Sequence, residues 1–384
     1  MLIKSALSGV KYLLPEDFDF ETAVQTATKH QILALIYYGA LNCGLSQDLP
    51  VMQRLFIDTC RLVMISEQQM YAINDMFARF DENKIDYMPL KGTLLKKMYP
   101  KSEMRIMGDA DILIRTEQYD KIIPVMQSLG FTERLESDHE LVWYKRGAYI
   151  ELHKRLVPSY NKDYYAYFGD GWRLGKPVSD GDTRYAMTAE DEMIYLFTHY
   201  AKHYRDAGIG IKHIVDLWVY RNSVKELNNE YIFGELKKLQ LDVFYKNTMR
   251  TLDVWFEDAA SDDVTEFITK IIFNSGAYGT YEAHLLSDAV KVSKQTGTVK
   301  KTRAKKIIDL IFLPYKSMCK KYPILEKTVI LLPVMWVVRW FNVLFFKREN
   351  IRKINGDLKI ISAEKIDDYQ KALNFVGLDF NFKE

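Results

Sequence analysis

The chain contains very little cysteine, with only Cys43, Cys60 and Cys319 among 384 residues. They are odd in number and far apart, and no two have the spacing of a zinc-ligand pair. This pattern argues against a disulfide-stapled or zinc-finger protein. It is typical of a reducing compartment, so we expect a cytoplasmic protein.

An excess of charge of one sign is also missing, because 53 lysines and arginines stand against 51 aspartates and glutamates, for a net charge of +2. Whole-molecule electrostatics therefore neither require nor exclude a polyanionic partner. Near the N-terminus, Lys4 and Lys11 interrupt every apolar run that approaches the length of a signal peptide, which predicts against secretion. The sequence also lacks internal repeats and long low-complexity segments.

Hydrophobic periodicity divides the chain into three regions. Apolar residues at helical spacing predict a helical region over 1–83. Strand-like runs separated by turns, with one helical stretch that ends at Gly130, predict a small domain over 84–187. Helical patterns return after Thr188, which is placed to cap a helix, and predict a mainly helical region over 188–384. The expected class is α+β, with a small mixed-sheet domain embedded between two helical regions.

Two aspartates one residue apart lie inside an apolar run, MGDADILIR. Strand alternation places Asp109 and Asp111 on one face and Ile112 and Ile114 on the other. Like charges this close resist joint ionisation unless a cation neutralises them, and carboxylate oxygens are ligands that Mg²⁺ accepts. Glu151, in the strand-like run AYIELHK, adds a third carboxylate on an expected neighbouring strand. Three such carboxylates can hold two metal ions.

The stretch IDYMPLKGTLLKKMY predicts a strand, a tight turn and the start of a helix. Gly92 permits close backbone approach and a positive φ, and Thr93 can cap the helix. The exposed N–H groups of such a turn favour a phosphate.

The order of these features resembles the polymerase-beta-type nucleotidyltransferase superfamily: a strand, a Gly-Thr turn, a helix, Asp-x-Asp on a second strand and an acid on a later strand. More narrowly, the chain is similar to a broad bacterial group of uncharacterised nucleotidyltransferases. The segments that carry this similarity are PLKG at 89–92, DADILI after Arg105, LGF at 129–131 and IELHK at 150–154. The resemblance implies that Asp109, Asp111 and Glu151 are catalytic ligands of Mg²⁺ or Mn²⁺. It also implies that Gly92 and Thr93 form the turn on the phosphate side.

Other polar residues flank this predicted site. Lys91 and Arg105 are placed to neutralise triphosphate charge, with a surface salt bridge as the alternative for Arg105. His153 shares the face of Glu151 by alternation, so we expect it to touch the site or orient a ligand, unless it is a hydrogen-bonded structural histidine.

His199 and His203 stand at i and i+4 of a predicted helix, a spacing that can bind a transition metal. No glutamate follows the first histidine, as it does in zinc proteases, so contact with nucleotide phosphates or packing against the catalytic domain is favoured over zinc.

Two C-terminal segments bear on partners. Residues 291–306 contain seven basic residues and no acidic one, which favours a solvated linker, with RNA contact as the second interpretation. In the segment 328–346, 15 of 19 residues are apolar, but Pro333, Arg339 and Asn342 interrupt it. We expect this segment to be a buried or self-associating helix, with peripheral membrane contact as the second interpretation.

Together these features predict a metal-dependent nucleotidyltransferase. It would transfer a nucleoside monophosphate from an NTP, with ATP expected, to a hydroxyl of a protein, RNA or small-molecule acceptor. The alternative is a catalytically inactive nucleotide- or RNA-binding protein, or a toxin-like component, on the same fold. The complete set of three carboxylates favours the enzyme.

Overall fold

The computed structural model describes residues 1–296, 312–346, 356 and 360–379. The chain forms two compact units. The first contains Met1–His203, Ile209–Tyr278 and the chain from Val376, and the second contains Tyr204–Gly208 and Gly279–Phe375. The boundaries predicted at 83 and 187 both lie within the first unit, so the division into three regions stays a prediction.

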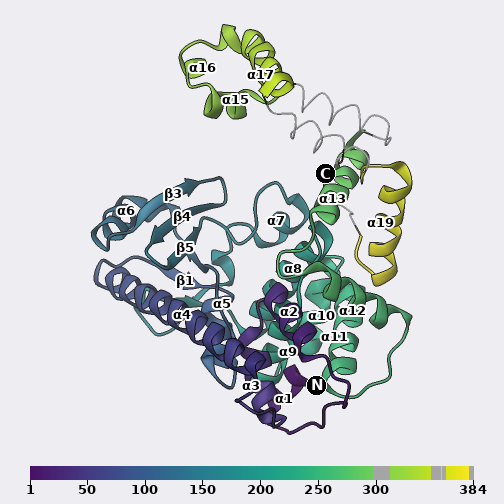
Figure 1. Cartoon of the computed structure of the whole chain (residues 1–384). Coiled ribbons are helices and arrows are strands. Elements are labelled where there is room, and N and C mark those ends of the chain that lie inside the picture. Colours follow the sequence, from purple (N-terminus) through teal and green to yellow (C-terminus); the bar gives the residue numbers. More distant parts are fainter. Residues whose placement is uncertain (297–311, 347–355, 357–359, 380–384) are drawn as a thin grey trace. The chain divides into compact units, whose positions relative to one another are not determined.

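A five-stranded mixed sheet lies in the first unit (Figure 1). Its strands are ordered β1-β2-β5-β4-β3. The β2–β5 pair is parallel and the other pairs are antiparallel. The bounds are β1 Tyr87–Pro89, β2 Ala110–Ile114, β3 Thr132–Glu136, β4 Glu140–Lys145 and β5 Ala148–His153. Because helices flank this sheet along the chain, the predicted α+β class is confirmed.

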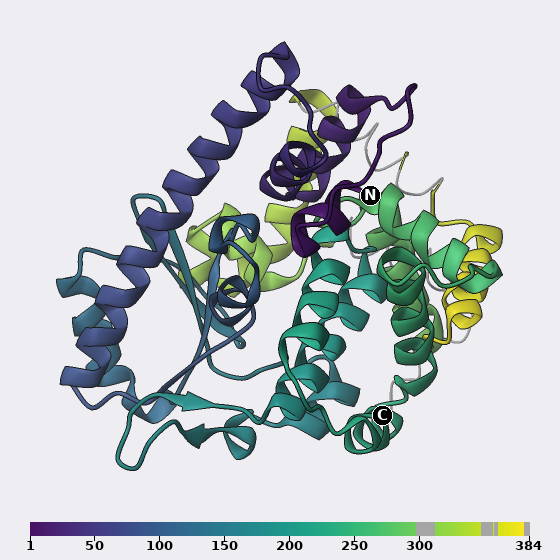
Figure 2. The same cartoon turned by 90° about the horizontal axis from the view of Figure 1, so that it is seen from below.

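One face of the sheet is buried against two helices, α4 (Pro50–Glu82) and α6 (Tyr119–Ser128). Ile112 of β2 and Ile150 of β5 belong to the same buried cluster as Ile73 and Met76 of α4. Figure 2 shows α4 as a single long helix beside the sheet. Since side chains alternate along a strand, the residues next to each of these isoleucines in its own strand point to the opposite face of the sheet, where the polar pocket lies.

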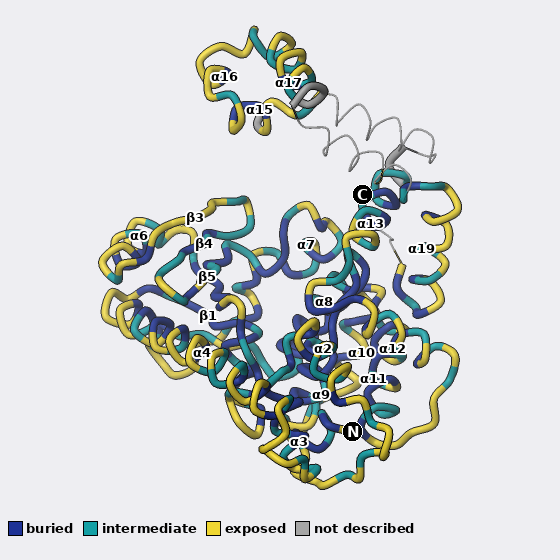
Figure 3. Tube along the Cα trace, in the orientation of Figure 1, coloured by how far each residue is buried: buried dark blue, intermediate teal, exposed yellow. Residues whose placement is uncertain are grey.

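The sequence patterns located most of these elements. Four of the five strands coincide with strand-like runs, and α6 is followed by Gly130 in the left-handed region at φ 80°, as its position after a helix predicts. The edge strand β3 was not predicted. All five of its residues are exposed (Figure 3), so the sequence has no alternation of buried and exposed residues to reveal it.

The other α-helices of the first unit lie before, between and after the strands of the sheet in the sequence. They are α1 Leu2–Ser8, α2 Phe20–His30, α3 Leu33–Asn42, α5 Gly92–Leu95, α7 Lys162–Phe168, α8 Ala189–Asp206 up to His203, α9 Ile211–Ser223, α10 Asn229–Lys238, α11 Asp242–Phe256 and α12 Asp263–Ser275. Thr188 caps α8 as predicted, because its hydroxyl accepts the N–H of Asp191 at 3.1 Å.

The second unit is helical where it is described. Its elements include α13 Tyr281–Thr296, α15 Tyr315–Lys321, α16 Ile324–Lys327, α17 Leu332–Phe346 and α19 Ala363–Val376, of which Val376 lies in the first unit. Residues 297–306 of the basic segment 291–306, for which RNA contact is the second interpretation, lie outside the described residues. Within the described part of that segment, Lys291 pairs with Asp206 at 2.9 Å.

The apolar segment 328–346 contains a 3₁₀ turn, Val329–Leu331, followed by α17. Met335 and Trp336 pack against a small core around Met318. Ile330 and Val337 are 86% and 70% exposed, so the segment is only partly buried. Among the residues that the structure describes, no helix combines the length and the hydropathy needed to cross a bilayer.

Candidate functional site

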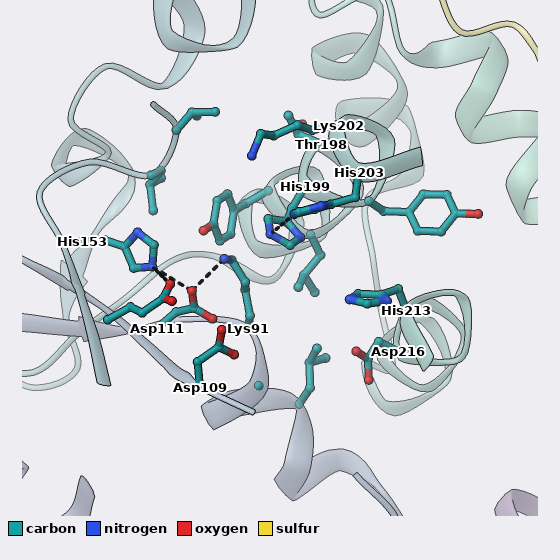
Figure 4. Close-up of a pocket in the computed structure, with 18 of the residues that line it drawn as sticks. Lys91, Asp109, Asp111, His153, Thr198, His199, Lys202, His203, His213 and Asp216 are labelled. Atoms are coloured by element: carbon teal, nitrogen blue, oxygen red, sulfur yellow. Dashed lines mark hydrogen bonds and ion pairs between the residues drawn. The ribbon is translucent and has the colours of Figure 1, made fainter. Parts of the chain in front are cut away.

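A pocket of about 430 Å³ lies on the polar face of the sheet and is lined by residues of β2, β5, α8 and α9 (Figure 4). Five of the seven histidines of the chain line it: His139, His153, His199, His203 and His213. Asp111, Glu140 and Glu151 come from the sheet, whereas α8 and α9 contribute histidines and lysines, and α9 also contributes Asp216. This combination suits a ligand that carries negative charge together with a cation.

Asp111 of β2 is buried at the centre of this arrangement. Its Oδ1 accepts hydrogen bonds from Lys91 Nζ at 2.8 Å and from His153 Nε2 at 2.7 Å. Burial by itself raises the pKa of a carboxyl, but Lys91 and His153 together hold the pKa of Asp111 well below its usual value. Asp111 is therefore ionised, and the ammonium group of Lys91 is its positively charged partner.

Glu151 stands beside Asp111 because β2 and β5 run parallel with these two residues in register. Its Oε2 lies 3.6 Å from His153 Nε2. Burial, followed by the charges of Asp111, Asp109 and Glu140, raises the pKa of Glu151 to about 8. A carboxyl group in such crowding is stabilised as a carboxylate when a cation binds next to it.

Asp109 precedes β2 and is exposed. In Figure 4 its carboxylate points toward Asp111 and Lys91, as strand alternation predicts. The donor atoms of Asp111, Glu151 and His153 lie within 4.8 Å of one another. Asp109 belongs to no such group of three among the described residues. The third member of this cluster is therefore His153, whereas the sequence predicted Asp109.

The turn between β1 and α5 differs from the prediction in detail. The positive φ of 44° belongs to Lys91, not Gly92, and Thr93 is the second residue of the helix rather than its cap. The Thr93 hydroxyl is buried and donates to the Leu90 carbonyl at 2.7 Å. Close backbone approach at Gly92 is correct, because a Cβ there would lie 3.2 Å from Met107 Sδ. Thr93 therefore stabilises the turn from inside.

Arg105 has a partner within the protein that the sequence did not predict. Its guanidinium is buried and binds Asp216 of α9 through Nε and Nη2, each at 2.9 Å, while Nη1 donates to the Ile106 carbonyl at 2.9 Å. The Tyr99 hydroxyl donates to the same Asp216 carboxylate at 2.7 Å. Because this ion pair is buried, the alternative of a surface salt bridge is wrong. Arg105 also lines the pocket, and its contact with a triphosphate stays a prediction. Arg105 joins the β2 side of the pocket to α9.

His199 and His203 of α8 face the pocket, with their Nε2 atoms 3.1 Å apart. Burial, Lys91 and the neighbouring imidazole lower the pKa of His199 well below 6.5, so its ring is neutral. His213 of α9 lies nearby, with its ring 6.5 Å from that of His203. It was missed because its place in a helical pattern, IKHIVDLW, carries no motif of its own.

Two lysines of the pocket wall, Lys202 and Lys212, were not predicted to line the site. Lys212 donates to Gln31 Oε1 at 2.9 Å rather than pairing with Asp216 four residues later in α9. Burial and then the charge of Arg105 lower the pKa of Lys212 to about 8. The sequence did not mark Lys212 as a site residue, because its i,i+4 spacing to Asp216 is also typical of ion pairs on a helix surface.

His139 and Glu140 lie at the start of β4, across from His153. His139 Nε2 is 3.1 Å from His153 Nδ1, and burial lowers the pKa of His139 to about 2. They too were missed, because only the pairing of β4 with β5 brings these residues together.

A mixed sheet that presents the buried Asp111 and the half-buried Glu151 to a histidine- and lysine-lined pocket is suited to metal-assisted chemistry on phosphates. Residues 16–257 match the model of a family described as an uncharacterised nucleotidyltransferase, and the chain belongs to this family. The matched range contains the whole sheet and the helices that line the pocket. Membership supports a role in nucleotidyl transfer and implies an NTP substrate.

A search of curated proteins and a search of solved structures each found no match to the chain.

Proposed function

We propose that the protein is a metal-dependent nucleotidyltransferase that moves a nucleoside monophosphate from an NTP, with ATP expected, to a hydroxyl of a protein, RNA or small molecule. The acceptor oxygen bonds to the α-phosphorus while the bond to the β-phosphate oxygen breaks, which releases pyrophosphate and a proton. The observation that carries this proposal is the register of Asp111 and Glu151, which places two carboxylates side by side in a pocket of this family's domain.

The donor chemistry of the pocket fits a divalent cation. Asp111 and Glu151 would hold it, with Asp109 directed toward the same space (Figure 4). The raised pKa of Glu151 supports this fit, since crowded carboxylates are what a bound cation relieves. Oxygen donors suit both Mg²⁺ and Mn²⁺. When bound, such an ion supplies charge stabilisation for the triphosphate and an activated acceptor hydroxyl.

The chain's own residues would orient the nucleotide. Lys91 lies between Asp111 and the ring of Tyr195 and is placed to neutralise phosphate charge. His199 and His203, as neutral imidazoles or after protonation, can donate hydrogen bonds to phosphate oxygens. Gly92 keeps the backbone close to Met107 beside this space. Arg105 acts as a positioning residue through Asp216.

The activity is tested by incubating the full chain with each NTP labelled at the α-phosphate, with Mg²⁺ or Mn²⁺ and a cell extract as the acceptor source. We expect label in a protein, RNA or small-molecule fraction, and no label when EDTA is present. If the chain binds nucleotide but transfers none with any NTP and either metal, it is a binding protein on this fold, and the enzymatic proposal is wrong.

Lys91→Met gives a test of the nucleotide side. We expect transfer to fall on the order of 10²-fold, because one charge-assisted contact to the triphosphate is lost. Mg²⁺ alone should bind more tightly than to the wild type, because Asp111 no longer has an ammonium partner. Isothermal titration with Mg²⁺ and a transfer assay measure both effects.

Lys97→Met is the matched control for Lys91→Met, since Lys97 is exposed and outside the pocket lining. It should change neither quantity. Weaker Mg²⁺ binding in Lys91→Met would contradict the proposal that Lys91 and the metal compete for Asp111.

Partners and location belong to the same proposal. NTPs are cytoplasmic substrates, and the three cysteines are free, which supports a cytoplasmic protein. RNA contact through 291–306 rests on its basic composition. Self-association or peripheral membrane contact through 328–346 is supported by the exposed Ile330 and Val337. Chemical crosslinking of the full chain tests self-association, and vesicle flotation of the full chain tests membrane contact.

A further inference from the structure

The proposed reaction leaves one cluster of ligating side chains unused. His139 and Glu140 meet His153 on the side of its ring that faces away from Asp111. We propose that His139, Glu140 and His153 form a second metal site, selective for a divalent transition-metal ion such as Zn²⁺ and distinct from the carboxylate site. This inference does not rest on the proposed nucleotidyl transfer.

The distances between the three donor atoms fit a single small ion. His139 Nε2 and His153 Nδ1 are 3.1 Å apart, and Glu140 Oε2 lies 3.9 Å from each of them. The point equidistant from the corners of this triangle is about 2.1 Å from every donor atom, which is the length of Zn–N and Zn–O bonds. An ion can therefore bind with little movement of the side chains.

The donor set differs from that of the carboxylate site. Two imidazoles and one carboxylate are typical ligands of Zn²⁺ and its first-row neighbours. Mg²⁺ prefers oxygen ligands and retains several waters, so it should favour the carboxylates of Asp111 and Glu151. Ligand type thus separates the two sites, although His153 stands between them.

Asp111 orients His153 for this second role. A carboxylate only accepts hydrogen bonds, so His153 Nε2 carries the proton in its 2.7 Å contact with Asp111 Oδ1. In the neutral ring, the lone pair then lies on Nδ1, the atom that faces His139 and Glu140. A carboxylate that orients a metal-binding imidazole in this way is a recurrent feature of zinc sites.

The backbone around the cluster is fixed by hydrogen bonds. The Ser137 hydroxyl accepts the N–H groups of His139 at 3.2 Å and Glu140 at 3.0 Å. The Lys154 N–H donates to the His139 carbonyl at 2.8 Å. Glu140 and His153 are direct partners of the β4–β5 pair. All three ligands line the pocket, so an ion can reach them from solvent.

The test titrates the full chain with Co²⁺ in excess Mg²⁺, and follows the visible absorption that Co²⁺ acquires in a low-coordinate site. We expect one Co²⁺ per chain, displaced by Zn²⁺. His139→Gln and Glu140→Gln should each weaken binding by at least about tenfold. Circular dichroism confirms that each variant is folded, and if one fails to fold, the other carries the test.

His199→Gln is the matched control, because His199 and His203 form the other close imidazole pair of the pocket. This variant should bind Co²⁺ as the wild type does. Loss of binding in His199→Gln with retention in His139→Gln would move the ion to α8 and overturn the proposal, as would no Co²⁺ binding at all. Either result leaves the proposed nucleotidyl transfer intact, since that is measured by labelled NTP.

Discussion

Replacing Asp111 with asparagine is expected to reduce nucleotidyl transfer on the order of 10²- to 10³-fold or more. Asp111 is the ionised carboxylate at the centre of the site, and it contacts Lys91 and His153 through the same oxygen. Asparagine keeps the shape but removes the charge that would hold the metal and, through it, the triphosphate. The transfer assay with labelled NTP and titration of Mg-NTP measure this loss.

Asp111→Asn should also lower the free energy of unfolding, by about 1–3 kcal/mol, because the half-buried Lys91 loses its charged acceptor. A chain that retains its helical circular dichroism while transfer disappears separates catalysis from stability.

Asp86→Asn is the matched control for Asp111→Asn. Asp86 pairs with Arg115 at 2.7 Å and does not line the pocket, so the variant also breaks one aspartate ion pair of the same domain. Transfer should be unchanged in Asp86→Asn. Equal turnover of Asp111→Asn and the wild type would remove Asp111 from the reaction and with it the proposed mechanism.

The carboxylate face was predictable because strand alternation is a local property. The period of two places Asp109 and Asp111 on one face and Ile112 on the other without reference to any other part of the chain. That Glu151 stands next to Asp111 depends on the parallel pairing of β2 with β5, which joins segments about 40 residues apart. The sequence predicted only that the two strands are neighbours, and the structure shows that they are parallel and in register.

Other parts of the site depend on contacts that no local pattern encodes. Arg105 and Asp216 are 111 residues apart, so the sequence could not reveal that the guanidinium binds a carboxylate of α9. The close approach of His139 to His153 requires the β4–β5 hairpin. The positive φ of Lys91 was assigned to Gly92 because glycine is the usual residue in that conformation.

The second large effect is expected at the buried ion pair between Arg105 and Asp216. Asp216→Ala should lower the free energy of unfolding by about 3–5 kcal/mol, because it leaves the Arg105 guanidinium buried without its carboxylate. The Tyr99 hydroxyl loses its acceptor in the same variant. Urea unfolding of the full chain, followed by circular dichroism, measures the loss.

A double variant distinguishes the ion pair from simple loss of packing. Arg105→Met with Asp216→Leu replaces both charges by apolar groups, and it should recover much of the stability that Asp216→Ala loses, since no unpaired charge remains. Asp253→Ala is the surface control, because Asp253 is a 41% exposed partner of Arg221 and should cost less than about 1 kcal/mol. If Asp253→Ala and Asp216→Ala destabilise the chain equally, Arg105 is not held by Asp216.

If the double variant regains stability but transfers nucleotide poorly, the ion pair acts by fixing α9 against the site. That outcome would give Arg105 a positioning role that the Asp111 experiments alone cannot show.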